Sequence, residues 1–143
     1  YLTTYDSVHG RLPEPVRVED GALVYGGRRV PVFGESAPEQ LPWARLGVDV
    51  VIEATGAFTA RAAAARHLAA GARRVLVGAP SPDADVTLVL GVNPGDFDPD
   101  AHRIVSNASC TTNSLAPVLM VLNRSFGLEE VVATTVHAYT ASQ

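Results

Sequence analysis

The middle of the chain carries apolar runs of strand length on either side of one alanine-rich stretch of helix length. The run Val48–Glu53 is almost continuously apolar, which is typical of a strand buried on both faces. We expect Thr59 to cap a helix over residues 60–70. Further apolar runs at 75–77 and 86–90 predict strands. Strand, helix and strand in this order predict an α/β fold with a parallel sheet and a crossover helix.

The two flanking regions show different periodicities. Residues 16–33 contain short apolar runs separated by Asp-Gly and Gly-Gly, pairs that tolerate the positive φ of tight turns, so antiparallel strands are predicted with Pro31 on an edge. Beyond Cys110, apolar positions recur at helical spacing as far as Gly127, although Pro117 should make that helix irregular. The run at 131–136 predicts a last strand.

Composition limits the possible partners. The chain has 143 residues, which suits one domain, and a formal charge of −4. Its basic residues are all arginine and are scattered along the chain, so we expect no nucleic-acid partner. The absence of lysine excludes Schiff-base chemistry on a lysine within these residues.

A single cysteine cannot form an internal disulfide, which favours a reducing, cytoplasmic compartment. No apolar run is long enough to cross a bilayer, so we expect no membrane partner. No pair of histidines has metal-ligand spacing, and we expect no metal. His67 falls within the alanine-rich stretch and is interpreted as a solvated or packing residue.

The candidate chemistry centres on that cysteine. Cys110 lies between Ser109 and Thr111 where the predicted helix begins, and the free N–H groups of a helix start stabilise a thiolate. His137 follows the predicted strand at 131–136, from which an imidazole can reach the sulfur, so a Cys–His pair is predicted. A buried structural cysteine beside an ordinary helix start is the competing interpretation.

The stretch SNASCTTNSLAP at 106–117, followed by TTVHAYT at 134–140, resembles the phosphorylating glyceraldehyde-3-phosphate dehydrogenases. The resemblance extends over YDSVHGR at 5–11, VDVVIEATGAF at 48–58 and GAPSPDADVTLVLGVN at 78–93. It implies a Rossmann-type sheet lacking its first strands in residues 1–109, and the start of an α+β catalytic domain in residues 110–143. On this basis we expect an internal fragment that is inactive by itself.

The resemblance implies NAD- or NADP-dependent oxidation of glyceraldehyde 3-phosphate to 1,3-bisphosphoglycerate in glycolysis or gluconeogenesis, with inorganic phosphate as a second substrate. It implies that Cys110 is the nucleophile and His137 its acid–base partner. It also assigns the attacking phosphate to Ser109 and Thr111 and the substrate phosphate to Thr140. A full-length homotetramer is implied as well.

The cofactor residues rest most heavily on the resemblance, because the chain contains no G-x-G-x-x-G motif. The resemblance places Thr55, Gly56 and Phe58 along the dinucleotide. Two further positions depart from the family pattern: Gly78 stands where Ser or Thr is common, and Ser36 where Arg or Lys is common. Backbone contacts to the cofactor are still expected there.

Three alternatives stay open. Erythrose-4-phosphate dehydrogenase shares the cysteine motif. A non-catalytic nucleotide-binding module would explain the incomplete cofactor loops, and a cysteine hydrolase would use the same Cys–His pair without a cofactor.

Overall fold

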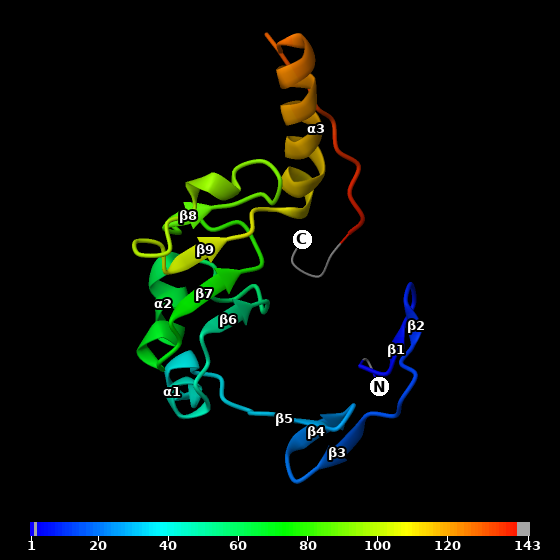
Figure 1. Ribbon diagram of the computed structural model, residues 1–143, viewed down its shortest axis with the longest axis vertical. Coiled ribbons are helices and arrows are strands. Elements are labelled where there is room, and N and C mark those ends of the chain that lie inside the picture. The colour runs from blue at the N-terminus through cyan, green and yellow to red at the C-terminus, as the bar shows by residue number, and fades with distance from the viewer. Residues whose placement is uncertain (2, 140–143) are drawn as a thin grey trace. The chain divides into compact units, whose positions relative to one another are not determined.

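The computed structural model describes residue 1 and residues 3–139 (Figure 1). The described chain forms two compact units that divide between Ala37 and Pro38. Each unit has its own hydrogen-bonded sheets, and each is described by itself.

The strands of the N-terminal unit are antiparallel over the residues that the structure describes. They are β1 (Tyr5–Asp6), β2 (Gly10–Arg11), β3 (Arg17–Glu19), β4 (Ala22–Tyr25) and β5 (Arg28–Pro31). β1 pairs with β2, while β3, β4 and β5 form a three-stranded meander. The turn between β3 and β4 places Gly21 at φ +72°, and Pro31 lies in the edge strand β5, as the sequence predicted.

The second unit is built on a four-stranded sheet with the order β6-β7-β9-β8, in which every pair of neighbours is parallel. Its strands are β6 (Val50–Glu53), β7 (Arg74–Val77), β8 (Val86–Thr87) and β9 (Ile104–Ser106). Its helices are α1 (Trp43–Leu46), α2 (Arg61–Ala69) and α3 (Cys110–Phe126), with short 3₁₀ helices at Pro38–Gln40 and Pro94–Asp96. The predicted α/β fold with a parallel sheet is therefore confirmed.

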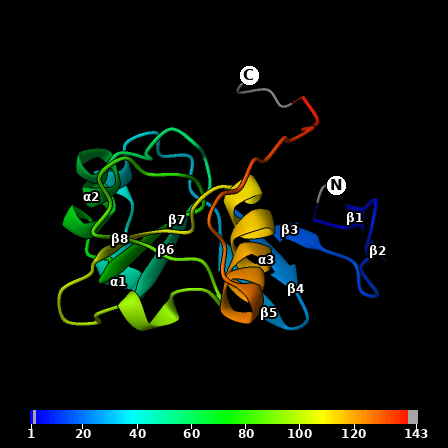
Figure 2. The ribbon, with the colours of Figure 1, turned by 90° about the horizontal axis from the view of Figure 1, so that it is seen from above.

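The core of this unit lies between α2 and one face of the sheet (Figure 2). Ala64 of α2 packs with Val75, Val77 and Ile104, and each of these side chains is at most 1% exposed. The strand residues face α2 because side chains alternate between the two faces of a sheet. α2 thus fixes the crossover between β6 and β7.

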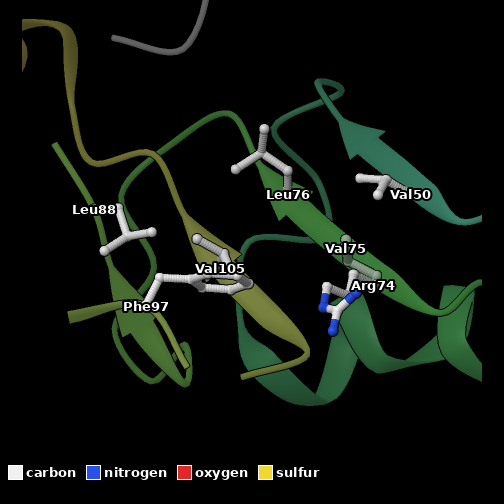
Figure 3. Close-up of a pocket in the computed structure, with 7 residues that line it drawn as sticks. All are labelled: Val50, Arg74, Val75, Leu76, Leu88, Phe97 and Val105. Atoms are coloured by element: carbon white, nitrogen blue, oxygen red, sulfur yellow. The ribbon is translucent and has the colours of Figure 1, made fainter. Parts of the chain in front are cut away.

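The opposite face of the sheet carries apolar side chains that α2 does not cover. Leu76, Leu88, Val105 and Phe97 line a hollow on this face together with Val50 (Figure 3). On β6, Val50 is 52% and Ile52 68% exposed, so the prediction of a strand buried on both faces is wrong for the described chain. A strand that is apolar on both faces is normally packed on both sides, but the described residues pack against only one face of β6.

The two ends of α2 are capped in different ways. The N-cap is Ala60 rather than Thr59, and the N-cap residue makes no side-chain capping bond, so the predicted Thr59 cap is wrong. Instead, the N–H of Arg61 donates to the carboxylate of Asp83 at 2.7 Å, which satisfies a free donor of the first turn from a distant loop. Past the other end, Gly71 has a φ of +103°.

The strand predicted at 86–90 ends after Thr87. Leu88 still donates to the carbonyl of Ser106, but the N–H of Val89 turns to the Asn93 side chain at 2.8 Å. The Asn93 amide also donates to the carbonyl of Thr87 at 3.0 Å. These side-chain bonds compete with the sheet and close a turn.

α3 begins at Cys110 and ends before Gly127, which has a φ of +71°, as predicted. The helix assignment is continuous across Pro117, so the expected irregularity does not interrupt it. The strand predicted at 131–136 is wrong. These residues are exposed coil and have no strand partner among residues 1 and 3–139.

Candidate active site

Cys110 is positioned by a tight turn between β9 and α3. Ser106 ends β9 fully buried, and its hydroxyl donates to the carbonyl of Ala79 at 2.8 Å while accepting from the N–H of Ala108 at 3.1 Å. Ala108 has a φ of +58°, which is uncommon for a residue with a Cβ. The N–H of Asn107 donates to the carbonyl of Val77 at 2.9 Å. The turn is thus tied to the carboxyl end of the sheet immediately before the cysteine.

Hydroxyl groups surround the start of α3. Ser109 is the N-cap and its side chain accepts from the N–H of Thr112 at 2.9 Å. The Ser109 hydroxyl also lies 3.0 Å from that of Thr111 and 2.7 Å from that of Thr112. A cluster of hydroxyl donors at a helix start is suited to an anion.

Asn113 holds this turn from inside the helix, a role that the sequence analysis missed. Its side-chain amide donates to the carbonyl of Asn107 at 2.7 Å and to that of Ser109 at 2.9 Å. The only hint in the sequence was that an asparagine stands one turn after the predicted start of this helix. It does not by itself distinguish an anchor from an exposed polar residue.

Cys110 and His137, predicted to act together, are in contact. After α3 the chain runs back along the helix toward its start (Figure 1), and residues 131–136 face Thr111, Leu115 and Val118. This brings Nε2 of His137 to 3.2 Å from Sγ of Cys110. Both residues are exposed, so the sulfur is accessible to a substrate.

The second nitrogen of His137 determines how the pair shares its proton. Nδ1 lies 2.6 Å from the carbonyl of Ala138, which only accepts, so Nδ1 carries a hydrogen. Nε2 is then a base toward the thiol in the neutral ring and a donor toward the thiolate in the charged ring. The geometry therefore allows a proton to move between Sγ and Nε2.

The environment favours the ionised pair. The hydrogen bond from His137 is the main cause that lowers the pKa of Cys110, and it is assisted by backbone N–H groups at the helix start. The hydrogen bond to Cys110, followed by that to the Ala138 carbonyl, raises the pKa of His137. Both directions increase the share of thiolate and imidazolium at neutral pH.

A second group of predicted site residues lies at the carboxyl end of β6. Thr55 and Gly56 are exposed there, and Gly56 has a φ of +76° with open space where a Cβ would be. The hydroxyl of Thr55 donates to Glu53 and accepts from the N–H of Ala57 at 3.1 Å. The carboxyl ends of parallel strands are where open α/β sheets bind ligands, and an exposed glycine turn allows close approach of a dinucleotide. These residues fit such a cofactor.

The remaining predicted residues, three for the cofactor and Thr140 for the substrate phosphate, lie in different settings. Phe58 is half-buried, and its ring forms a T-shaped pair with that of His67 at a centroid distance of 6.1 Å. Gly78 is exposed after β7, and its N–H donates to the carbonyl of Glu53 at 2.9 Å. Ser36 is exposed in the N-terminal unit, and Thr140 lies outside the described residues. The roles of all four stay predictions.

Two kinds of feature are absent from residues 1 and 3–139. They contain no group of three or more acidic, histidine or cysteine side chains placed to hold a metal ion. None of their helices combines the length and apolar character needed to cross a bilayer.

Two models of known protein families match this chain, one over each of its terminal parts. Residues 1–61 match the NAD-binding domain of glyceraldehyde 3-phosphate dehydrogenase, and residues 109–143 match its C-terminal domain. The chain belongs to the glyceraldehyde-3-phosphate dehydrogenase family. It is 57% identical to the enzyme of that name from Kitasatospora aureofaciens and 50% identical to that from Geobacillus stearothermophilus. The alignments cover 99% and 100% of this chain.

The chain spans 43% of the length of these glyceraldehyde-3-phosphate dehydrogenases. The match to the NAD-binding domain includes the predicted cofactor residues Thr55, Gly56 and Phe58. The match to the C-terminal domain includes the predicted catalytic residues Cys110 and His137. The first match supports NAD as the cofactor. The domain boundary predicted between residues 109 and 110 stays a prediction.

Proposed function

We propose that the protein containing this chain oxidises glyceraldehyde 3-phosphate to 1,3-bisphosphoglycerate with NAD and inorganic phosphate. The observation that carries the proposal is the 3.2 Å contact between Cys110 Sγ and His137 Nε2 at the capped start of α3. In a chain of this family, that contact supplies an activated thiolate on an exposed surface.

The first step uses the ion pair. The Cys110 thiolate attacks the aldehyde carbon, and the carbonyl oxygen becomes an oxyanion in a thiohemiacetal. The N–H of Cys110, in the first turn of α3, can donate to that oxygen, and the His137 imidazolium can protonate it. The sulfur and its own N–H belong to the start of α3, and His137 reaches the sulfur from the exposed coil that follows this helix.

His137 next acts as a base. It removes the hydroxyl proton of the thiohemiacetal while a hydride leaves the same carbon, and a thioester on Cys110 results. NAD, when bound, accepts the hydride. Thr55 and Gly56 would hold the cofactor through a hydroxyl and through backbone that Gly56 leaves accessible.

Inorganic phosphate then attacks the thioester carbon, and the Cys110 thiolate leaves. The hydroxyls of Ser109 and Thr111 lie 3.0 Å apart beside the cysteine and support this position for the attacking phosphate. Thr140 is proposed for the substrate phosphate on the resemblance alone. A cytoplasmic location and a homotetramer complete the proposal.

The test is a coupled assay of the full-length protein with glyceraldehyde 3-phosphate, NAD and phosphate. We expect phosphate-dependent NADH formation in the wild type, and loss of turnover in Cys110→Ser with NAD binding retained, because a serine hydroxyl is far less acidic than a thiol. Residual activity above a few per cent in the variant would remove Cys110 from the nucleophile role.

The same assay separates the alternatives. A higher kcat/KM for erythrose 4-phosphate than for glyceraldehyde 3-phosphate would favour erythrose-4-phosphate dehydrogenase. NAD binding without turnover of either aldehyde would favour a non-catalytic module.

A further inference from the structure

Two buried polar side chains, Glu53 and His67, take no part in the proposed chemistry. Their side chains are 3% and 6% exposed, and Oε2 of Glu53 lies 3.1 Å from Nε2 of His67. The indole N–H of Trp43 donates to Nδ1 of His67 at 3.1 Å. The other carboxylate oxygen, Oε1, accepts from both the N–H and the hydroxyl of Thr55.

The indole of Trp43 determines which atom donates and which accepts in each of these hydrogen bonds. An indole N–H can only donate, so Nδ1 of His67 must accept and Nε2 must carry the hydrogen. Nε2 then donates to Glu53, whose two oxygens both accept, as an ionised carboxylate does. Burial raises the pKa of Glu53, but the bonds from Thr55 and His67 outweigh it and the pKa is lowered overall.

The hydrogen bonds end at the turn assigned to the cofactor. Thr55 donates its hydroxyl to Glu53 and accepts from the N–H of Ala57 with the same oxygen, so Glu53 sets the orientation of that hydroxyl. The N–H of Thr55 donates to Glu53 at 2.7 Å. The backbone on either side of Gly56 is therefore bonded directly or indirectly to one buried carboxylate.

The far end of the same loop is also held by α2. The ring of Phe58 meets His67 edge-on at an interplanar angle of 84°, and the guanidinium of Arg66 lies 5.3 Å from its centroid. Arg66 is itself fixed by two bonds to Glu39, at 2.7 and 2.9 Å. Both ends of the loop are thus attached to one helix.

We propose that Glu53 and His67 are positioning residues that hold the Thr55–Gly56 turn in its dinucleotide-binding conformation before the cofactor binds, with Trp43 setting the direction of their hydrogen bonds. The proposal rests on the proposed function for the identity of the ligand. A preformed turn binds more tightly because its ordering cost does not have to be met on binding.

The decisive variant is Glu53→Gln in the full-length protein. Glutamine keeps the shape but offers one acceptor and one donor, whereas Thr55 and His67 both present N–H or O–H groups. His67 cannot accept instead, because its other nitrogen would then point a hydrogen at the indole N–H of Trp43. We expect NAD to bind about tenfold more weakly, with KM for NAD raised and kcat at saturating NAD little changed.

A second substitution tests the direction of the bonds. Trp43→Phe removes the indole donor, so His67 becomes free to carry its hydrogen on Nδ1 and to accept at Nε2 from a glutamine at position 53. We expect Glu53→Gln to weaken NAD binding by only about threefold in the Trp43→Phe background. If these residues had a purely structural role, the losses of NAD affinity caused by the two substitutions would add up or exceed their sum in the double variant.

Two controls separate positioning from loss of stability. Val75→Ala removes core volume next to α2 without touching the turn, and it should lower the melting temperature while leaving NAD affinity unchanged. Amide hydrogen exchange of the cofactor-free protein should be faster at Thr55 and Ala57 in Glu53→Gln than in Val75→Ala. If Glu53→Gln does not fold, Glu53→Asp keeps the charge but is too short to bridge Thr55 and His67, and the same losses are expected.

The outcomes are distinct. Failure of the wild type to bind NAD would overturn the proposed function and this proposal with it. Wild-type binding with unchanged affinity in Glu53→Gln, or an equal loss in both Trp43 backgrounds, would overturn the positioning role alone.

Discussion

The reactivity of Cys110 provides the sharpest measurement of the catalytic pair, and His137→Asn is the informative variant. The substitution removes Nε2 from its position 3.2 Å from the sulfur while leaving the helix start and its Ser109 cap intact. The hydrogen bond from His137 is the first cause that lowers the pKa of Cys110, so the variant's thiol pKa should rise toward its ordinary value.

The expected magnitude follows from the ionised fraction. An unperturbed thiol is only a few per cent ionised at neutral pH, so complete loss of the stabilisation reduces the thiolate about thirtyfold at most. The remaining thiolate is more basic and more nucleophilic, which offsets this by about threefold. We therefore expect alkylation of Cys110 by iodoacetamide at pH 7 to be slower in His137→Asn, by up to about tenfold.

The assay is the alkylation rate measured against pH. Because the pKa of Cys110 is lowered in the wild type, its rate should decline at a lower pH than the rate of the variant does. The variant's rate should already fall between alkaline and neutral pH. Both groups are exposed, so added salt should reduce the difference.

The same variant should lower turnover of the full-length enzyme by about 10² to 10⁴, the usual contribution of a positioned acid–base group. His9→Asn, at an exposed histidine of the N-terminal unit, is the matched control and should change neither quantity. Superimposable rate–pH profiles for wild type and His137→Asn would show that the ion pair does not exist in solution.

Two further predictions concern stability. Gly71→Ala should lower the free energy of unfolding by about 2 to 4 kcal/mol, because Gly71 has a φ of +103° and an added Cβ would lie 2.5 Å from Cβ of Ala44. The control is Gly91→Ala, at a φ of +81° with open space around the added Cβ, which should lower it by only about 1 kcal/mol. Equal urea midpoints for the two variants would refute the clash with Ala44. Burial raises the pKa of Asp85, but hydrogen bonds from the N–H groups of residues 103 and 104 and from a neighbouring arginine outweigh it, so the pKa is lowered overall. The ionised Asp85 therefore stabilises the folded protein above the unfolded-state pKa, and this stabilisation is lost as pH falls through the lower folded-state pKa. Urea denaturation from about pH 5 downward should show a flatter decline of stability in Asp85→Asn than in wild type, and parallel declines would contradict this.

The sequence alone was sufficient for features that depend on local pattern. The start of α3 at Cys110 and its end before Gly127 follow from helical periodicity between a hydroxyl cap and a glycine. The parallel sheet follows from short apolar runs on either side of a helical stretch, and the meander from its Gly-containing turns. The motifs around Cys110 and His137 were also sufficient to recognise the family.

Tertiary structure decided whatever depends on a partner distant in sequence. The strand predicted at 131–136 is coil because a strand needs a neighbour to accept its hydrogen bonds. The first turn of α2 donates the N–H of Arg61 to the distant Asp83 carboxylate rather than to a local cap. His67 could be interpreted from sequence only as solvated or packing. Its bonds to Trp43 and Glu53 join residues 24 and 14 positions apart, and only the packing of α2 against α1 and against the sheet brings such residues together.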